Sequence, residues 1–263
     1  MKRLYIFTGK GGVGKTTLAL AFAKYLHSRK KKVLYNNADQ IINSKLCNKL
    51  KIPYIHMEIA TSIEKYISSK LKSDIIASWI MKTPFAKSLF NIIPGIGYMI
   101  FLGHIIWMLE QDEDLTIVMD SQSSGHAITM FESPYNFKKI FGTGIVVNDI
   151  HKITSFMTNP DKIKVFVANL ANPMSVSEGD ELKNYLKKLS TPNIQLIMNN
   201  TFGNIPEIER SGKLPKFINK KILLEKKVYK SYQKQDIYIL PHMIDSSQEK
   251  IIQKLVPYAE KLM

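Results

Sequence analysis

The residues of this chain that are best suited to chemistry lie near its start, where glycines surround two lysines. Residues 9–17 read GKGGVGKTT and match the pattern GxxxxGK[ST]. In such a loop, glycines let backbone N–H groups surround phosphate oxygens, and the start of the next helix adds partial positive charge. Lys15 has the position that pairs with β- and γ-phosphates, and the Thr16 hydroxyl has the position that binds Mg²⁺. We therefore predict a nucleotide-phosphate site formed by Gly9, Gly11, Gly12, Val13, Gly14, Lys15, Thr16 and Thr17.

The segments around this loop have the order that the motif requires. Residues 4–8 form a short apolar and β-branched run typical of a buried strand, and residues 16–27 carry apolar side chains at helical spacing. The second lysine, Lys10, occupies a position where the pattern accepts any residue. Phosphate binding by a single chain does not require a lysine at this position, so the motif alone does not explain the role of Lys10.

Two acidic residues follow predicted strands and could complete the site. Asp120 ends the apolar run LTIVMD, where an aspartate can hold the Mg²⁺ shell, and Gly125 in the following SQSSGHA could bring its N–H to a γ-phosphate as part of a switch loop. Asp39 follows the second strand in LYNNADQ and could orient or deprotonate the attacking water. A turn-capping role remains the alternative for both aspartates.

Strand candidates alternate with helical stretches, which predicts an α/β fold with a mostly parallel sheet flanked by helices on both faces. The expected strands are residues 4–8, 32–36, 115–119, 163–168, 194–198 and 237–240. We expect one domain over residues 1–263, with a mainly helical insertion at 50–110 broken at Pro53, Pro84 and Pro94–Gly95, and a terminal helix at 246–262.

Composition limits the partners and the compartment. The formal charge is +15, but only three basic residues are arginines, which argues against sequence-specific DNA recognition. The densest basic stretch runs from Arg210 to Lys234 and is either a solvated face or an anion-binding surface. Cys47 is the single cysteine, and the loop begins too early to leave room for a signal peptide, so we expect a cytoplasmic protein.

Residues 89–109, LFNIIPGIGYMIFLGHIIWML, are apolar enough to suggest a membrane span. A single crossing would place the phosphate loop and Asp120 on opposite sides of the bilayer. Proline, glycine and His104 also interrupt the run. We therefore predict a buried or groove-lining helix.

Several motifs resemble one group of P-loop NTPases. KGGVGKTT, with its early lysine, resembles the deviant Walker A motif of the MinD, ParA, NifH and ArsA group. DSQSSGHAITMFESP is similar to the second switch of the ArsA and Get-type ATPases, and PGIGYMIFLGHIIWML to the segment before it in bacterial ArsA-like proteins. VFVANLANPMSVSEGDELKNYLKKL and IMNN resemble later strands and a helix of the same proteins, so the resemblance covers nearly the whole chain.

This resemblance implies a dimeric ATPase that binds ATP, ADP and Mg²⁺. It assigns Lys10 a role in trans, reaching the phosphates of the partner's nucleotide, and makes Asp39 the catalytic switch aspartate. Asp120 and Gly125 align with the second switch, and Asn199 with an asparagine that contacts adenine, although a strand-end turn is its plainer role. The partner would be a second copy or a related ATPase, and the client a protein or a membrane.

The departures from the family pattern keep other functions open. The proline that normally follows the switch aspartate is replaced by Gln40, and Gln122 and Ser123 stand where small residues or proline are usual, so hydrolysis could be slow or absent. The paired cysteines that bridge zinc and the cysteines that bind arsenite are absent, so we expect no zinc. A positioning ATPase of the MinD or ParA type remains the alternative, peripheral at the inner membrane face, with a basic surface or the terminal helix binding lipid or DNA.

Overall fold

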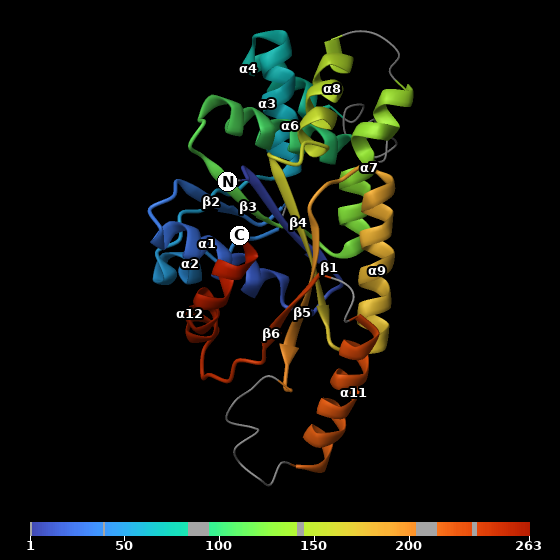
Figure 1. Ribbon diagram of the computed structural model, residues 1–263. Helices are drawn as coiled ribbons and strands as arrows, with labels where there is room; N and C mark the ends of the chain where they lie inside the picture. The colour runs from blue at the N-terminus through green and yellow to red at the C-terminus, as the bar shows by residue number, and fades with distance from the viewer. Residues whose placement is uncertain (1, 39, 84–94, 141–144, 204–214, 233–235) are drawn as a thin grey trace.

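The computed structural model describes residues 2–38, 40–83, 95–140, 145–203, 215–232 and 236–263. Over these residues six strands form one sheet in the order β2-β3-β1-β4-β5-β6, with every neighbouring pair parallel (Figure 1). The strands are β1 (Leu4–Gly9), β2 (Val33–Asn36), β3 (Thr116–Asp120), β4 (Ile163–Leu170), β5 (Ile194–Thr201) and β6 (Ile237–Pro241). The predicted α/β class is confirmed.

Both faces of the sheet are buried because successive side chains of a strand point in opposite directions. In β1, Leu4 and Ile6 enter one hydrophobic core, whereas Tyr5 and Phe7 enter the other. The first core is covered by α7 (Ser124–Ile140) and α9 (Pro173–Lys188), and α11 (Lys216–Tyr232) extends beyond α9 (Figure 1). The second core is covered by α1 (Lys15–Ser28), α2 (Ser44–Leu50) and α12 (Gln248–Ala259).

The helical insertion lies at one end of the sheet. Its described helices are α3 (Ile59–Leu71), α4 (Asp74–Lys82) and α6 (Ile96–Gln111), with α8 (Ile145–Met157) beside them (Figure 1). Helix α6 is the core of this end, since Phe101, Leu102 and Ile105 are almost fully buried. Among the described helices none has both the length and the apolar character needed to cross a membrane. Residues 84–94, with Pro84 and Pro94, lie outside the described residues.

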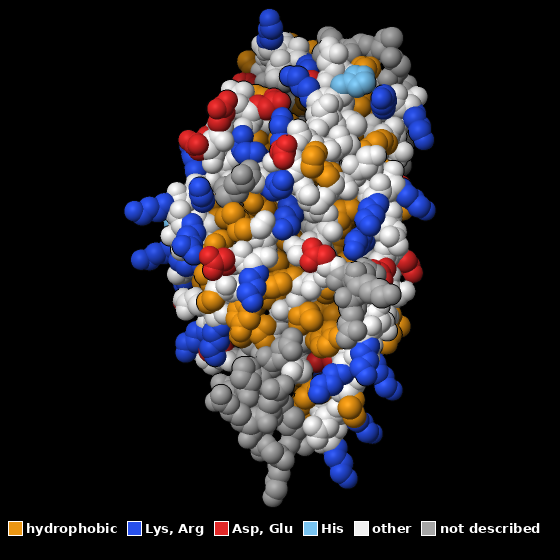
Figure 2. Space-filling model, in the orientation of Figure 1, with side chains coloured by type: hydrophobic (Ala, Val, Ile, Leu, Met, Phe, Trp, Pro, Cys, Tyr) orange, Lys and Arg blue, Asp and Glu red, His pale blue; other side chains and the backbone are white. Residues whose placement is uncertain are grey.

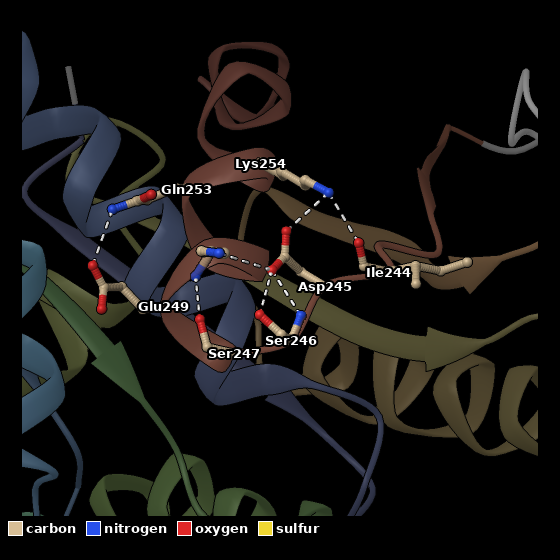
Figure 3. Close-up of polar contacts among 8 residues, drawn as sticks. Ile244, Asp245, Ser246, Ser247, Glu249, Gln253 and Lys254 are labelled. Carbon is tan, nitrogen blue, oxygen red and sulfur yellow. Dashed lines mark hydrogen bonds and ion pairs between the residues drawn. The ribbon is translucent and has the colours of Figure 1, made fainter.

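The terminal helix α12 is fixed at its start and packed along its length. Asp245 accepts hydrogen bonds from the Ser246 N–H at 2.7 Å and from Lys254 Nζ at 3.0 Å, and Ser247 Oγ caps the helix by accepting from the Lys250 N–H at 3.3 Å (Figure 3). The lysine holds the pKa of Asp245 below its ordinary value. The buried side of α12, which faces α1, is formed by Ile252, Leu255 and Ala259. Its apolar face is therefore part of the core.

Candidate nucleotide-binding site

The phosphate loop lies at the carboxyl edge of the sheet, directly after the central strand β1. Two of its glycines are required by close contacts. Gly9 has φ 138°, and a Cβ there would lie 2.3 Å from the carbonyl oxygen of Ala168 on β4. Gly14 has φ 92°, and a Cβ there would lie 2.4 Å from Asn199 Nδ2 on β5. The loop thus follows a path against its neighbours that L side chains would block.

Helix α1 begins immediately after this turn, at Lys15, with no acidic residue in its first turn. Its free N–H groups and partial positive charge therefore face the loop without a carboxylate from the helix's own first turn. Lys15 Nζ folds across the loop and donates to the carbonyl oxygen of Lys10 at 2.9 Å. Burial lowers the pKa of Lys15, and the nearby Asp120 opposes this change. The ammonium group is thus held over the loop, where it can meet a phosphate.

Asp120 is the buried acid of the site. It ends β3 beside Phe7 of β1 and is 1% exposed. One carboxylate oxygen, Oδ2, accepts from Thr16 Oγ1 at 2.6 Å and from the Tyr35 hydroxyl at 3.2 Å. Burial raises the pKa of Asp120 to about 6, despite both hydrogen bonds and the nearby Lys15. The strand pairing thus brings the predicted metal residues, Thr16 and Asp120, into direct contact.

This pair fits a magnesium ion. The second carboxylate oxygen of Asp120, Oδ1, is buried and has no hydrogen-bond partner among the described residues. Mg²⁺ takes oxygen ligands and is commonly held by one or two protein groups together with water and substrate phosphates. A hydroxyl and a carboxylate beside a phosphate loop supply that kind of oxygen, and the absence of a His, Cys, Asp and Glu cluster among the described residues does not conflict with it.

Lys10 has a partner that the sequence did not reveal. Its Nζ lies 2.5 Å from Glu178 Oε1 on α9, and both side chains are partly exposed. The two residues are 168 positions apart, so no local spacing pairs them. The only available signal was the acidic run in SVSEGDEL, which identifies candidate partners without selecting one.

Asn199, on β5, forms a hydrogen bond with the phosphate loop. Its Nδ2 donates to the carbonyl oxygen of Val13 at 2.9 Å, and the side chain is 2% exposed. Its other polar atom, Oδ1, is buried without a partner among the described residues. The structure thus places the predicted adenine-contacting residue at the site, but in a supporting position. The adenine contact stays a prediction.

The two switch segments lie close to each other. Gln122 Nε2, just after β3, donates to the carbonyl oxygen of Ala38 at 3.3 Å. Asp39, the predicted catalytic aspartate, lies outside the described residues. Gly125 is exposed in the first turn of α7, where a Cβ would meet nothing within 4 Å. The predicted contact of Gly125 with a γ-phosphate stays a prediction.

A polar contact joins the second switch to the helical insertion. Tyr98 on α6 donates to Gln122 Oε1 at 3.3 Å, and its hydroxyl lies 2.8 Å from His126 Nδ1 on α7. Gln122 therefore contacts both the first switch segment and α6. The substitution that departs from the family pattern forms a bridge in this chain.

Helix α6 also lines a cavity on its other side. The cavity has a volume of about 450 Å³ and lies between α3, α6 and α8. Its wall is largely apolar, with Met99, Ile100 and Trp107 from α6, and its edge carries Lys70 and Asp149, paired at 2.7 Å. A movement of α6 would therefore act on both the switch contact and this cavity.

The fold and the site together define a P-loop nucleotide-binding protein. The chain matches the family described as Anion-transporting ATPase over residues 2–148, and it belongs to that family. Curated relatives named ATPase ASNA1 homolog come from Plasmodium species. The relative from Plasmodium berghei (strain Anka) is 29% identical over 208 residues, and the one from Plasmodium chabaudi chabaudi is 28% identical over 208 residues. Each match covers 70% of this chain and 52% of the relative, so the chain spans about half the length of these relatives.

Proposed function

We propose that this protein is a Mg²⁺-dependent ATPase that acts as a dimeric switch and couples its nucleotide state to a protein or membrane client. The observation that supports this best is the contact of Thr16 Oγ1 with Asp120 Oδ2 at 2.6 Å, beside a phosphate loop with two lysines. The name of the relatives, ATPase, agrees with ATP as the nucleotide. We place the protein in the cytoplasm, with the inner membrane face as an alternative site of action.

In this proposal each functional group of the chain has a separate role. The loop N–H groups and Lys15 bind and neutralise the phosphates, which is most of what phosphoryl transfer requires of a protein. Thr16 and Asp120 would hold Mg²⁺, which would supply further neutralisation of the phosphate charge. Asp39 orients the attacking water. Lys10 leaves Glu178 and acts on the partner's nucleotide when two subunits meet.

The coupling to a client would pass through α6. The second switch changes its contacts when a γ-phosphate is bound or released, and Gln122 and His126 of that segment contact Tyr98. Helix α6 carries this tyrosine near its start and borders the cavity with its later turns. A displacement of Tyr98 would therefore shift α6 and change the shape of the helical end of the molecule, where a client could bind.

The test compares the two loop lysines. We expect Lys15→Ala to abolish ATP binding, because the phosphates lose their fixed cation. Lys10→Ala should keep ATP binding and lower turnover, with ~10³-fold as the upper range for a cation supplied in trans. Binding is measured with a fluorescent ATP analogue and turnover by phosphate release. Lys45→Ala, on an exposed residue of α2, is the control and should change neither.

The alternatives give different results in the same experiment. A nucleotide-binding subunit without hydrolysis would bind ATP but release no phosphate above the Lys15→Ala background. A positioning ATPase would turn over ATP and be captured by lipid or DNA only in one nucleotide state. Purification of an Asp39→Asn variant with ATP, followed by identification of co-eluting proteins, would find a client trapped in the ATP state.

A further inference from the structure

Helix α11 presents an unusual surface outside the nucleotide site. All six of its lysines are exposed: Lys216, Lys220, Lys221, Lys226, Lys227 and Lys230. Of these, Lys221 faces the body of the protein, with its Nζ 4.0 Å from the centroid of the Phe202 ring. Figure 2 shows blue basic side chains over this helix at the lower right of the molecule, with orange hydrophobic ones between them. The helix thus combines charge with apolar surface.

The charge of this face is not balanced by the helix itself. The only acidic residue of α11 is Glu225, and it is 1% exposed. Its carboxylate turns inward and accepts hydrogen bonds from the N–H groups of Phe202 and Gly203, each at 2.9 Å to Oε2. Val228 is also buried, so the inner side of the helix is fixed to the body of the protein. The outer side therefore carries lysines alone among charged residues of α11.

The apolar part of the face is exposed rather than packed. Phe217 is 68% exposed, Leu223 61% and Leu224 41%. At 100° per residue, Phe217 and Leu224 lie together at one edge of the outer face, and Leu223 lies between Lys216, Lys227 and Lys230. Large apolar groups among lysines are what a helix lying in a lipid interface presents, with apolar groups inserted and ammonium groups at the headgroups.

We propose that the outer face of α11 binds the surface of an anionic lipid bilayer. Leucine and phenylalanine gain nothing from a phosphate backbone, and the face contains no arginine for base or phosphate readout, so the chemistry favours lipid over nucleic acid. The terminal helix α12, the other candidate in this chain, is excluded from this role because its apolar side is packed in the core. The proposal is independent of ATP turnover.

The experiment measures co-sedimentation of the full chain with vesicles of phosphatidylcholine alone or with 30% phosphatidylglycerol, without nucleotide. We expect binding only to the anionic vesicles, weakened at high salt. Lys220→Gln with Lys227→Gln should lower the partition coefficient by about tenfold or more, given the electrostatic contribution of each lysine near an anionic surface. Phe217→Gln with Leu223→Gln should lower it by about tenfold through lost apolar burial.

Matched controls use other helices. Lys45→Gln with Lys49→Gln removes the same charge from exposed positions on α2, and Ile75→Gln with Trp79→Gln removes exposed apolar groups from α4. Both controls should bind vesicles as the unmodified protein does, and thermal unfolding should show that all variants are folded.

Three outcomes would overturn the proposal. Anionic vesicles could capture nothing, or the controls could lose vesicle binding as much as the α11 variants do. In the third, the α11 variants would keep vesicle binding and lose only the binding of a DNA or RNA oligonucleotide measured in parallel. ATP turnover is measured separately, so a failure here leaves the proposed ATPase untouched.

Discussion

At the scale of single residues, the site is built around the carboxylate of Asp120, whose buried charge lowers the free energy of unfolding. Asp120 is held by Thr16 and Tyr35 through one oxygen, while its other oxygen is buried and unpaired among the described residues. A buried charge that is not fully compensated lowers stability, and groups of this kind are common where a protein binds a cation. The arrangement suits a ligand that supplies positive charge.

The first prediction concerns the stability cost of this charge. The ordinary pKa of an aspartate, 3.8, rises to about 6 in the fold. The folded state therefore holds the proton more tightly than the unfolded state, and the free energy of unfolding falls as the pH rises from 4 to 6. In buffer with EDTA and no nucleotide, Asp120→Asn should raise the free energy of unfolding at pH 7 by up to about 3 kcal/mol.

Urea unfolding at several pH values checks this expectation. The advantage of Asp120→Asn should shrink toward pH 4, because the carboxyl of the folded protein is protonated there and no longer carries a buried charge. The same variant should lose the Mg²⁺ dependence of ATP binding. An advantage that is equal at pH 4 and pH 7 would show that the desolvated charge is not its cause.

At the scale of elements, packing of α9 on β4 determines where Glu178 lies. Gly179 follows Glu178, and a Cβ there would lie 2.2 Å from Asn169 Oδ1. Asn169 is 3% exposed and donates to the carbonyl oxygen of Val167 at 3.0 Å, so its side chain has little freedom to move. The glycine therefore permits a close approach of helix and strand.

The second prediction follows from this contact. Gly179→Ala should lower the free energy of unfolding by about 1–3 kcal/mol, because overpacking outweighs the better helix propensity of alanine. Gly125→Ala is the matched control, since a Cβ there meets nothing within 4 Å, and its stability should be equal or slightly higher. Thermal and urea unfolding measure both. Equal stability of the two variants would mean that Asn169 can move aside.

The elements also show what the sequence could and could not predict. The strands were predicted within a few residues, because each contains apolar residues in sequence, and the central strands β1 and β3 are buried along their whole length. The loop and its contact with Asp120 were predicted because parallel strands bring their ends to one edge. Residues 121–127 were predicted as a switch loop from their small polar side chains, whereas α7 begins at Ser124, since Ala127, Met130 and Phe131 are buried in the core.

The missing predictions involve contacts between distant segments. The sequence predicted only that Tyr35 lies in a strand. The pairing of β2 with β3 brings its hydroxyl to Asp120. Glu178 reaches Lys10 because α9 follows β4, which pairs with β1. Helix propensity and periodicity carry no information on such pairs, because they depend on the order of strands in the sheet.

At the scale of the whole molecule, the proposed dimer requires Lys10 to change partners. Its ion pair with Glu178 joins two partly exposed side chains, with 52% and 38% of their side-chain surfaces accessible. Exposed pairs of this kind contribute about 0–1 kcal/mol, so releasing the lysine costs little for each subunit. Two subunits would together give up at most about 2 kcal/mol, or a factor of roughly 30 in the dimer dissociation constant.

The third prediction is that Glu178→Gln favours the dimer in the presence of Mg²⁺ and a non-hydrolysable ATP analogue. The neutral amide holds Lys10 less strongly, so the lysine is already available to the partner's phosphates, and the dissociation constant should fall by up to about 30-fold. Analytical ultracentrifugation over a range of concentrations measures it. Glu181→Gln, on an exposed residue of the same helix, is the control and should leave the constant unchanged.

A weaker dimer for Glu178→Gln would show instead that Glu178 binds the partner's lysine after the exchange. If neither variant nor unmodified protein forms a dimer at any concentration, the trans role of Lys10 fails, while nucleotide binding by Lys15, Thr16 and Asp120 stands on its own geometry.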